Sequence, residues 1–174
     1  MTGKQFINAI ANGKADIIGA LLDLLTKTST DYCIIGGLAV NAYVEPVVSL
    51  DLDIVIATDQ IDDLCNAATK SGMKIKKYPR SVNLSARGSH VRVQIQMDGR
   101  YQDFIEKAHS KTVLGYKMKV ARVEDVLAGK VWAYTDQGRR TSKRYKDMAD
   151  IARLIERYPR LLSSLPGKIR KQID

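Results

Sequence analysis

Two aspartates separated by one residue, Asp51 and Asp53, stand in an apolar segment of this chain of 174 residues and limit the structures that the segment is able to form. Side chains alternate in character from 50 to 57, which is the period of a β-strand, and both carboxylates then share one face. Like charges on one face repel each other unless a cation or a basic side chain offsets them. The pair therefore predicts a strand with a metal or phosphate site, against the plainer alternative of the polar face of an edge strand.

Upstream of the aspartates, Gly36 and Gly37 follow a short apolar run at 32–35. Residues 38–43 then have a helical pattern, so this segment predicts a strand, a glycine turn and a helix. A turn without Cβ atoms lets backbone amides approach phosphate oxygens, and the start of the following helix favours negative charge. Alone, the two glycines indicate an ordinary tight turn; with the aspartates downstream they favour a phosphate site.

The remaining patterns predict an α/β (α+β) fold, a small mixed sheet flanked by helices with a C-terminal helical extension. We expect one domain over 1–174, with the sheet core in about 30–122 and the C-terminal helices in 123–174. The expected helices are one or two in 4–26, one at 60–70 capped by Thr58 and Asp59, and others at 101–108, 123–136, 140–157 and after Pro166. The expected later strands are 82–86, 90–97 with Val91, Val93, Ile95 and Met97 buried, and residues around 112–120.

Composition narrows the class of protein. A net charge of +9 and a pI near 9.6 point to polyanions such as nucleic acid or nucleotide phosphates. No stretch approaches the roughly 18 apolar residues of a membrane span, and the first residues lack a signal-peptide pattern. Cys33 and Cys65 lie in apolar runs and predict buried, reduced thiols. We therefore expect a cytoplasmic protein without a membrane partner.

The order of the motifs resembles a known superfamily. Residues 34–40, with the glycines, and 49–56, with the aspartates, are similar to the signature of DNA polymerase beta-like nucleotidyltransferases. Residues 126–133 and 139–151 resemble the C-terminal signature of the AbiEii/AbiGii toxin-like branch. In that signature a helical lysine, basic residues and a Lys/Arg-Asp pair accompany the glycines and the Asp-x-Asp motif. The resemblance spans about residues 30–155.

The resemblance implies roles for individual residues. Asp51 and Asp53 would hold magnesium or manganese and would be catalytic together with Asp147, which would organise the site or act as a base. The phosphate-binding residues that it implies are Gly36, Gly37, Ser49, Lys130, Arg140 and Lys143. From the residues alone, plainer alternatives stay open: Lys130 is able to reach solvent, and Asp147 is able to pair with basic neighbours on its own helix.

The chain departs from the superfamily at its usual third carboxylate. The strand expected to supply that acid has Gln94 at the position. A neutral amide neither activates an attacking hydroxyl nor holds a second magnesium ion as a carboxylate does. Asp98 lies four residues further on, but Asp98-Gly99 is also an ordinary turn pair, which is the interpretation we favour.

Two functions follow from the resemblance. The first is magnesium-dependent transfer of a nucleotidyl group from a nucleoside triphosphate to a hydroxyl of RNA, tRNA among the candidates, or of a protein. Such an enzyme would be toxin-like and restrained by an antitoxin protein. The second is a catalytically impaired relative that binds nucleotides or nucleic acid as a regulatory module, since Gln94 puts full catalysis in question.

Overall fold

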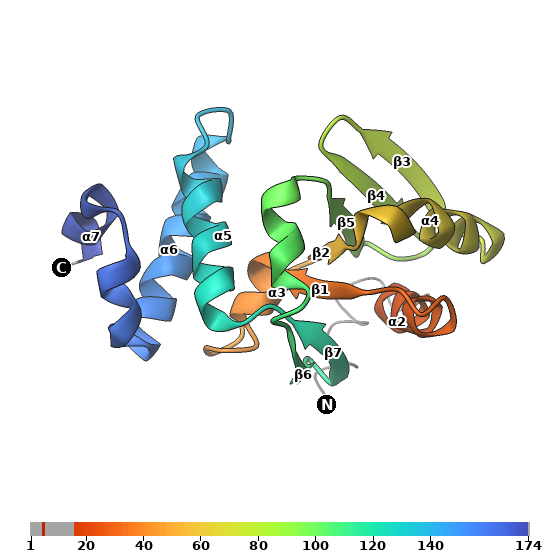
Figure 1. Ribbon diagram of the computed structural model, residues 1–174, viewed down its shortest axis with the longest axis horizontal. Helices are drawn as coiled ribbons and strands as arrows, with labels where there is room; N and C mark the ends of the chain where they lie inside the picture. Colours follow the sequence, from red (N-terminus) through yellow and green to blue (C-terminus); the bar gives the residue numbers. More distant parts are fainter. Residues whose placement is uncertain (1–4, 6–15, 174) are drawn as a thin grey trace.

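The computed structural model describes Gln5 and residues 16–173 (Figure 1). The strands are β1 (Tyr32–Ile35), β2 (Asp51–Ile56), β3 (Lys74–Tyr78), β4 (Ser81–Ser85), β5 (Arg92–Gln96), β6 (His109–Val113) and β7 (Tyr116–Val120). The α-helices are α2 (Ile17–Lys27), α3 (Gly36–Val40), α4 (Ile61–Lys70), α5 (Val123–Thr135), α6 (Thr141–Arg157) and α7 (Gly167–Ile173). Short 3-10 helices are η1 (Thr58–Gln60), η2 (Gly99–Phe104) and η3 (Pro159–Ser164).

All seven strands form one mixed sheet in the order β3-β4-β5-β2-β1-β7-β6. The strand with the aspartates, β2, lies in the middle, parallel to β5 on one side and antiparallel to β1 on the other. β1 continues in parallel to β7, and antiparallel pairs of strands complete both edges of the sheet. The predicted fold class, a small mixed sheet flanked by helices, is confirmed.

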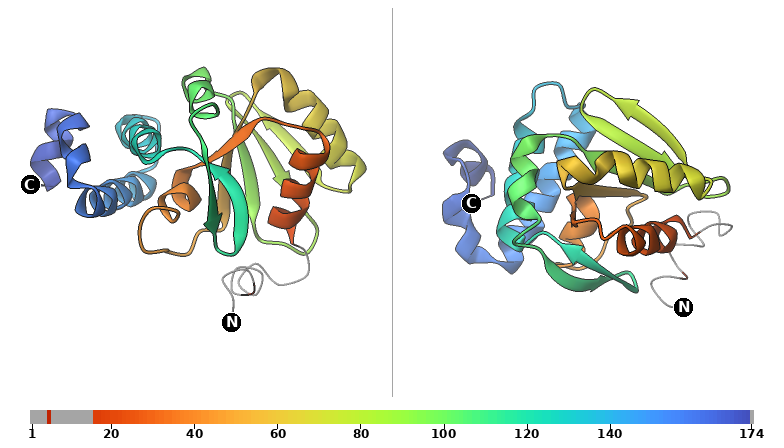
Figure 2. Two further views of the ribbon diagram at one scale, coloured as in Figure 1. Left: turned by 60° about the horizontal axis from the view of Figure 1, so that its bottom comes forward. Right: turned by 45° about the vertical axis from the view of Figure 1, so that its right-hand side comes forward.

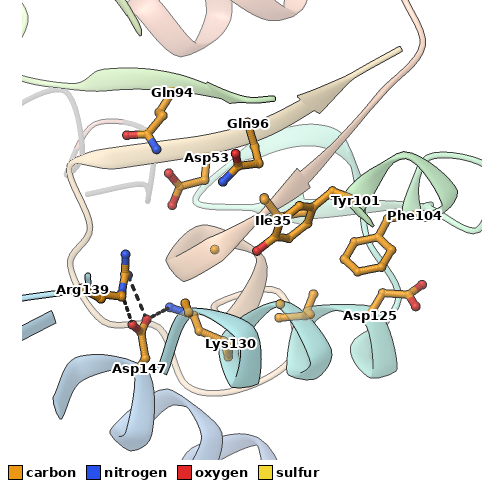
Figure 3. A pocket seen from close by; sticks show the side chains of 14 residues that line it. Ile35, Asp53, Gln94, Gln96, Tyr101, Phe104, Asp125, Lys130, Arg139 and Asp147 are labelled. Atoms are coloured by element: carbon orange, nitrogen blue, oxygen red, sulfur yellow. Dashed lines mark hydrogen bonds and ion pairs between the residues drawn. The ribbon is translucent and has the colours of Figure 1, made fainter. Parts of the chain in front are cut away.

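The two faces of the sheet have different surroundings (Figures 1 and 2). On one face α2 contacts α4, α4 contacts β3, and α2 contacts β7. α3 contacts β1 and β2 and also touches α5 and α6, which pack along each other beside the sheet. Leu52, Ile54 and Ile56 of β2 are fully buried, whereas Asp53 points toward the side of the sheet where α5 and α6 lie (Figure 3). The sequence alternation in β2 thus separates a core face from a polar face.

Most of the predicted elements are present. The run at 32–35 is β1, and the predicted elements after residue 58 correspond to α4, β4, β5, β6, β7, α5, α6 and α7. α2 lies at the end of the leading helical segment, while 6–15 lie outside the described residues. α3 begins at Gly36, two residues earlier than predicted, and ends at Val40. It starts early because Gly36 makes the turn alone, with φ at 68°.

The prediction that Met97 is buried is wrong, since its side chain is 42% exposed. β5 ends at Gln96, whose side-chain oxygen accepts hydrogen bonds from the amides of Met97 and Asp98 at 3.0 and 3.2 Å. These bonds turn the backbone out of the strand. The alternation that buries Val93 and Ile95 therefore stops before Met97.

Three further details differ from the sequence predictions. Thr58 and Asp59 do not cap α4 but belong to η1, which leads into it. The helix expected at 101–108 is the shorter 3-10 helix η2, which begins two residues earlier, after Asp98 caps it by accepting a hydrogen bond from the amide of Arg100 at 3.0 Å. β3 was missed because its residues are nearly all polar, as is common in edge strands that resist pairing with other chains.

Both thiols are buried and unpaired, as predicted for Cys33 and Cys65. Burial raises the pKa of the Cys33 thiol to about 12, so the thiol stays protonated at neutral pH. In the part of the chain that the structure describes, no helix combines the length and the apolar composition needed to cross a membrane.

Candidate active site

The site is centred on Asp53, at the polar face of β2. In the parallel pairing of β2 with β5, Asp53 lies directly beside Gln94. Gln94 thus has the position, next to the aspartates, where a third carboxylate was expected. The side chains of Asp53, Gln94 and Gln96 all line one pocket (Figure 3). Sequence reasoning missed Gln96, although its place two residues after Gln94 on a strand put it on the same face.

Gly36 is what allows the end of β1 to approach Asp53 closely. A Cβ atom at Gly36 would lie 2.2 Å from Oδ2 of Asp53 and 2.9 Å from its Cβ. The residue also has a φ of 68°, which L side chains rarely adopt. Two independent requirements, space and backbone conformation, therefore demand glycine here.

The pocket lies between the sheet and α5. Its lining comes from β1, α3, β2, β5, η2, α5, α6 and the loop before α6. The lining residues are Ile35, Gly36, Asp53, Gln94, Gln96, Tyr101, Phe104, Asp125, Val126, Gly129, Lys130, Ala133, Arg139 and Asp147.

One wall of the pocket is aromatic. Tyr101 and Phe104 of η2 line it, and Trp132 of α5 packs behind them, with ring centroids 5.2 Å from Tyr101 and 5.6 Å from Phe104. Gly129 makes room for this wall, because a Cβ there would already lie 3.1 Å from Cε1 of Tyr101. Sequence reasoning missed the aromatic wall, since η2 is a 3-10 helix that only tertiary packing brings to the pocket.

The opposite wall is a cluster of buried charges that joins α5 to α6. Lys130 of α5 lies 3.1 Å from Oδ1 of Asp147 and 2.7 Å from Oδ2 of Asp150, the latter an ion pair without hydrogen-bond geometry. Arg139 forms a further ion pair with Asp147, and Arg153 lies 2.8 Å from Asp150. Three cations thus face two carboxylates, so the cluster carries a net positive charge beside Asp53.

Asp147 is held from two directions. Its side chain is 1% exposed, its Oδ1 accepts hydrogen bonds from Lys130 at 3.1 Å and Arg139 at 3.2 Å, and its Oδ2 accepts another from Arg139. Both oxygens of Asp147 thus already accept hydrogen bonds from cations. The arrangement suits a residue that organises the site, and it does not suit a general base.

Asp51 lies at the rim of the pocket instead of inside it. Arg92 donates to its Oδ1 at 2.8 and 3.1 Å, and Lys143 of α6 lies 3.4 Å from its Oδ2. Ser49 donates to the backbone oxygen of Asp51 at 3.1 Å. A Cβ at Gly37 would lie 3.3 Å from the Ser49 hydroxyl, so the second glycine belongs to this rim as well.

Asp53 differs from Asp51 in its partners. Burial raises the pKa of Asp53, while the positive charges of Lys130 and Arg139 counteract part of that rise. Among the described residues, none donates a hydrogen bond to Asp53 or forms an ion pair with it. A half-buried carboxylate without a partner is costly unless a cation offsets it.

The donor set fits one hard cation better than two. Asp51 and Asp53 share a face of β2, and Mg²⁺ commonly takes one or two protein carboxylates with the remaining oxygens from water and phosphate. In the part of the chain that the structure describes, no group of three or more acidic, histidine or cysteine side chains is placed to share a metal. Gln94 beside Asp53 is neutral, so it does not supply the further carboxylate that a second metal ion would need.

Comparison with known proteins identifies the family. Residues 30–165 match the family described as nucleotidyl transferase AbiEii toxin, of type IV toxin-antitoxin systems. The chain belongs to the AbiEii family. The predicted superfamily and toxin branch are thereby confirmed. Among curated proteins, none matches this AbiEii chain.

Solved structures share the AbiEii chain's fold at low sequence identity. The antibiotic-resistance factor ANT(2'')-Ia is 10% identical with a TM-score of 0.61, over 90% of this chain and 86% of its own. The lincosamide antibiotic adenylyltransferase LnuA is 14% identical with a TM-score of 0.55, over 79% and 95%. An antigenic nucleotidyltransferase-like protein from Paracoccidioides brasiliensis is 23% identical with a TM-score of 0.56, over 80% and 74%. At these identities the likeness shows the nucleotidyltransferase fold.

The structure sorts the residues predicted for the AbiEii site into three groups. Those that line the pocket are Gly36, Asp53, Lys130 and Asp147. Those that surround the rim are Gly37, Ser49, Asp51 and Lys143. Arg140 belongs to neither group: it is exposed at the start of α6, while its neighbour Arg139 lines the pocket. Consecutive residues at a helix start point in different directions, so composition alone could not choose between the two arginines.

Three alternatives left open by the sequence are now decided. Lys130 does not reach solvent, since it is 6% exposed and paired with two carboxylates. Asp147 pairs across to α5 and to the loop before α6, and only Asp150 pairs within its own helix, with Arg153. Asp98 caps η2 and pairs with Arg100, so the turn interpretation of Asp98 is confirmed.

Proposed function

We propose that this AbiEii protein transfers a nucleotidyl group from a nucleoside triphosphate to a hydroxyl of RNA, tRNA among the candidates, or of a protein. One observation carries the proposal. Across one pocket, Asp53, which has no partner among the described residues, faces a net positive cluster that includes Arg139 and Lys130. A triphosphate needs cations on one side and carboxylates that bind a metal on the other. Membership of a family of nucleotidyl transferase toxins supports the same function.

Phosphate oxygens would be bound by the basic wall and the glycine turn. Arg139 is the most exposed cation of the cluster, at 34% of its side chain, and it lines the pocket, so it is able to contact a ligand directly. Lys130 would contribute its charge from behind, because two carboxylates hold it. At the rim, Gly37, Ser49 and Lys143 would be further phosphate contacts. Arg140 is exposed outside the pocket and would contact only the outer part of a bound acceptor.

The aromatic wall would accept the nucleobase. Tyr101 and Phe104 present apolar ring surfaces to the pocket, opposite the charged wall. Base stacking on aromatic side chains tolerates any base, because every base has a π-face. The amides of Gln94 and Gln96, with donors and acceptors, would add hydrogen bonds to polar atoms of the nucleotide.

Magnesium or manganese would be held by Asp53 and Asp51. When bound, such an ion neutralises phosphate oxygens and lowers the pKa of the attacking hydroxyl. Asp53 has no partner to give up among the described residues, whereas Asp51 would have to exchange Arg92 and Lys143 for the cation. Lys143, once released, would lie beside the bound phosphates. Asp147 would act as a positioning residue that keeps Arg139 and Lys130 directed at the pocket.

The experiment that tests the proposal uses purified protein with magnesium or manganese, each labelled nucleoside triphosphate, and either total RNA or a protein mixture. We expect label to reach one acceptor class with the natural sequence and with Asp59→Asn, an exposed carboxylate of η1. We expect no label with Asp53→Asn, which keeps the shape of the side chain but removes its charge. Equal labelling by the natural sequence and Asp53→Asn would refute the proposal.

One observation favours a second function. Because Gln94 stands beside Asp53, the protein would be a catalytically impaired relative that binds nucleotides or nucleic acid as a regulatory module. Gln94→Asp separates the two, since it supplies the expected third carboxylate. In the impaired relative the natural sequence binds nucleotide without transfer and Gln94→Asp gains transfer; in the enzyme, transfer is present from the start.

The toxin description also suggests a cellular role. We infer that the protein acts in the cytoplasm, where nucleotides and RNA are found, and that an antitoxin protein restrains it. Induced expression should slow growth with the natural sequence and not with Asp53→Asn. Equal growth inhibition by both proteins at equal abundance would show that the toxicity does not come from this site.

A further inference from the structure

The strands at one edge of the sheet carry positively charged side chains and no negatively charged ones. From residue 64 to residue 97 the chain has no aspartate or glutamate. The same segment holds the basic residues Lys70, Lys74, Lys76, Lys77, Arg80, Arg87 and Arg92. The segment covers the end of α4 and then β3, β4 and β5, and four of these seven basic residues lie on β3 and β5.

The pairing of these strands connects the sheet edge to the pocket. Residues directly opposite each other on paired strands share one face of a sheet. One row of such residues, from edge to centre, is Lys76, Asn83, Gln94 and Asp53. A second row is Tyr78, Ser81 and Gln96. Each row thus runs from the sheet edge at β3 to a glutamine of β5 that lines the pocket, Gln94 in the first row and Gln96 in the second.

The face that carries these rows is the one turned away from α4. Lys77, one position along from Lys76, lies on the other face, where it pairs with Asp62 of α4 at 3.1 Å. On the polar face Lys74, Lys76 and Tyr78 are exposed, Tyr78 at 42%. Figure 1 shows β3 and β4 on the far side of β5 from α5 and α6. We call this surface, formed by the polar side chains of β3, β4 and β5, the β3–β5 face.

On the β3–β5 face Arg92 pairs with Asp51, whereas three other cations of this face and of the turn between β3 and β4 lack a carboxylate partner among the described residues. In the part of the chain that the structure describes, Lys74, Lys76 and Arg80 form no ion pair. The Nζ of Lys76 lies 5.1 Å from the ring centroid of Tyr78, so a cation and an aromatic ring stand together at the edge. The row also contains a buried acceptor without a hydrogen-bond partner, Oδ1 of Asn83. Tyr78, Arg80 and Asn83 line one shallow hollow.

We propose that the β3–β5 face binds the single-stranded end of an RNA acceptor and directs its terminal hydroxyl to Asp53. Unpaired cations beside an exposed aromatic ring are the elements of a sequence-tolerant site for single-stranded nucleic acid. Lys74, Lys76 and Arg80 contact phosphates, and Tyr78 stacks on a base. Three strand spacings separate Lys76 from Asp53, about 14 Å, which a few nucleotides span. The acceptor role rests on the proposed function, while RNA binding does not.

The first test measures binding of a short, fluorescent single-stranded RNA of mixed sequence by anisotropy, without nucleoside triphosphate. The variant is Lys74→Gln/Lys76→Gln/Arg80→Gln. Its matched control, Lys27→Gln/Lys107→Gln/Lys117→Gln, removes the same charge from exposed positions on other elements. We expect the Kd of the variant to rise at least about tenfold and that of the control to change less than about twofold. The slope of log K against log salt should fall by about 2, at roughly 0.7 per lost phosphate contact.

The second test concerns the ring of Tyr78. Tyr78→Ala should weaken binding of the same RNA by at least about fivefold, because one base loses its stacking partner. Tyr78→Phe keeps the ring and should bind as the natural sequence does. Equal loss in both variants would mean that the hydroxyl group is responsible instead of stacking.

The outcomes separate this inference from the proposed function. Unchanged RNA binding by the triple variant, or equal weakening by its control, would overturn the β3–β5 face as the RNA site. RNA binding that depends on the face, together with transfer of label to protein acceptors or to none, would refute only the acceptor role. A fall in kcat/KM for RNA in the triple variant, with the Kd for nucleoside triphosphate unchanged, would support both parts.

Discussion

At the scale of single residues, the site depends on glycines, which leave space for neighbouring groups, as well as on charged and aromatic side chains. Gly36 leaves the space into which Asp53 projects, and Gly129 leaves the space for the ring of Tyr101. Asp53 in turn lacks a partner among the described residues, whereas Asp51, two residues away, has both oxygens occupied by Arg92 and Lys143. Neighbouring residues of the same type thus have different chemistry because their surroundings differ.

Gly36→Ala tests this arrangement. The new Cβ would meet Oδ2 of Asp53 at 2.2 Å and would also hold alanine at a φ of 68°, so we expect a loss of more than about 2 kcal/mol in the free energy of unfolding. Gly72→Ala is the matched control, with a φ of 88° and no atom within 4 Å of the new Cβ. Its cost should be about 1–2 kcal/mol, from the backbone alone. Urea titration measures both, and equal losses would show that the contact with Asp53 does not matter.

The hydroxyl of Tyr43 should make stability depend on pH in alkaline solution. It donates a hydrogen bond to the backbone oxygen of Ala121 at 2.7 Å, and burial raises its pKa from 10.0 to about 12. A raised pKa means that the folded state holds the proton more tightly than the unfolded state. The stability that this provides is complete below pH 10 and is lost as the pH rises to about 12.

Tyr43→Phe isolates this effect. The variant should be less stable by about 1 kcal/mol at neutral pH, because it lacks one hydrogen bond. Between pH 10 and about 12 it should lose less stability than the natural sequence. Cys33, whose pKa is also raised, is present in both proteins, so its contribution cancels in the difference. Parallel losses measured by urea titration would contradict the prediction.

At the scale of elements, α5 and α6 are joined by buried charges as well as by apolar contacts. Asp147 and Asp150 are 1% and 2% exposed, and each pairs with two cations. Buried ion pairs contribute little net stability when complete, but removal of one member leaves an uncompensated charge. The cluster therefore fixes the geometry of the two helices and with it the direction of Arg139.

Asp147→Asn should be costly for this reason. We expect the free energy of unfolding to fall by about 3 kcal/mol, since Arg139 and Lys130 lose a shared counter-charge in a buried place. The control is Glu124→Gln, which removes an exposed pair with Arg160 and should cost less than about 1 kcal/mol. Chemical denaturation of the three proteins gives the comparison; a loss of similar size in both variants would remove the special role of the cluster.

At the scale of the whole molecule, the pocket joins two layers. Asp53 and Gln94 come from the sheet, while Lys130 and Asp147 come from α5 and α6 (Figure 3). A ligand that contacts both layers binds only the folded arrangement, so it should stabilise the protein through mass action. Nucleotide and metal together should therefore raise the free energy of unfolding of the protein.

Thermal unfolding measures this linkage. With manganese and a bound nucleoside triphosphate at about 100 times its Kd, the natural sequence should gain about 2.7 kcal/mol and a higher Tm. A chelator should remove most of the gain, because Asp53 would then face phosphate without a cation. Asp53→Asn should show little gain with metal present. The same rise in Tm for both proteins would place the metal elsewhere.

Much of the fold and part of the site were predictable from the sequence, because they depend on local periodicity. Alternation predicted β2 with its aspartates on one face, and the glycines after an apolar run predicted the turn into α3. The two long C-terminal helices followed from their 3.6-residue pattern in the same way. Such patterns show which side chains share one side of a helix or strand, and this is sufficient to predict which side is buried.

Contacts between segments distant in the chain were decided only by the tertiary structure. Parallel pairing of β2 with β5 put Gln94 beside Asp53, and packing of α5 on α6 buried Lys130 against Asp147. The turn before α6 directed Arg139 into the pocket and left Arg140 outside. The physical reason is that periodicity specifies which side of a segment is buried, whereas the partner of a charge depends on which other segment reaches it in three dimensions.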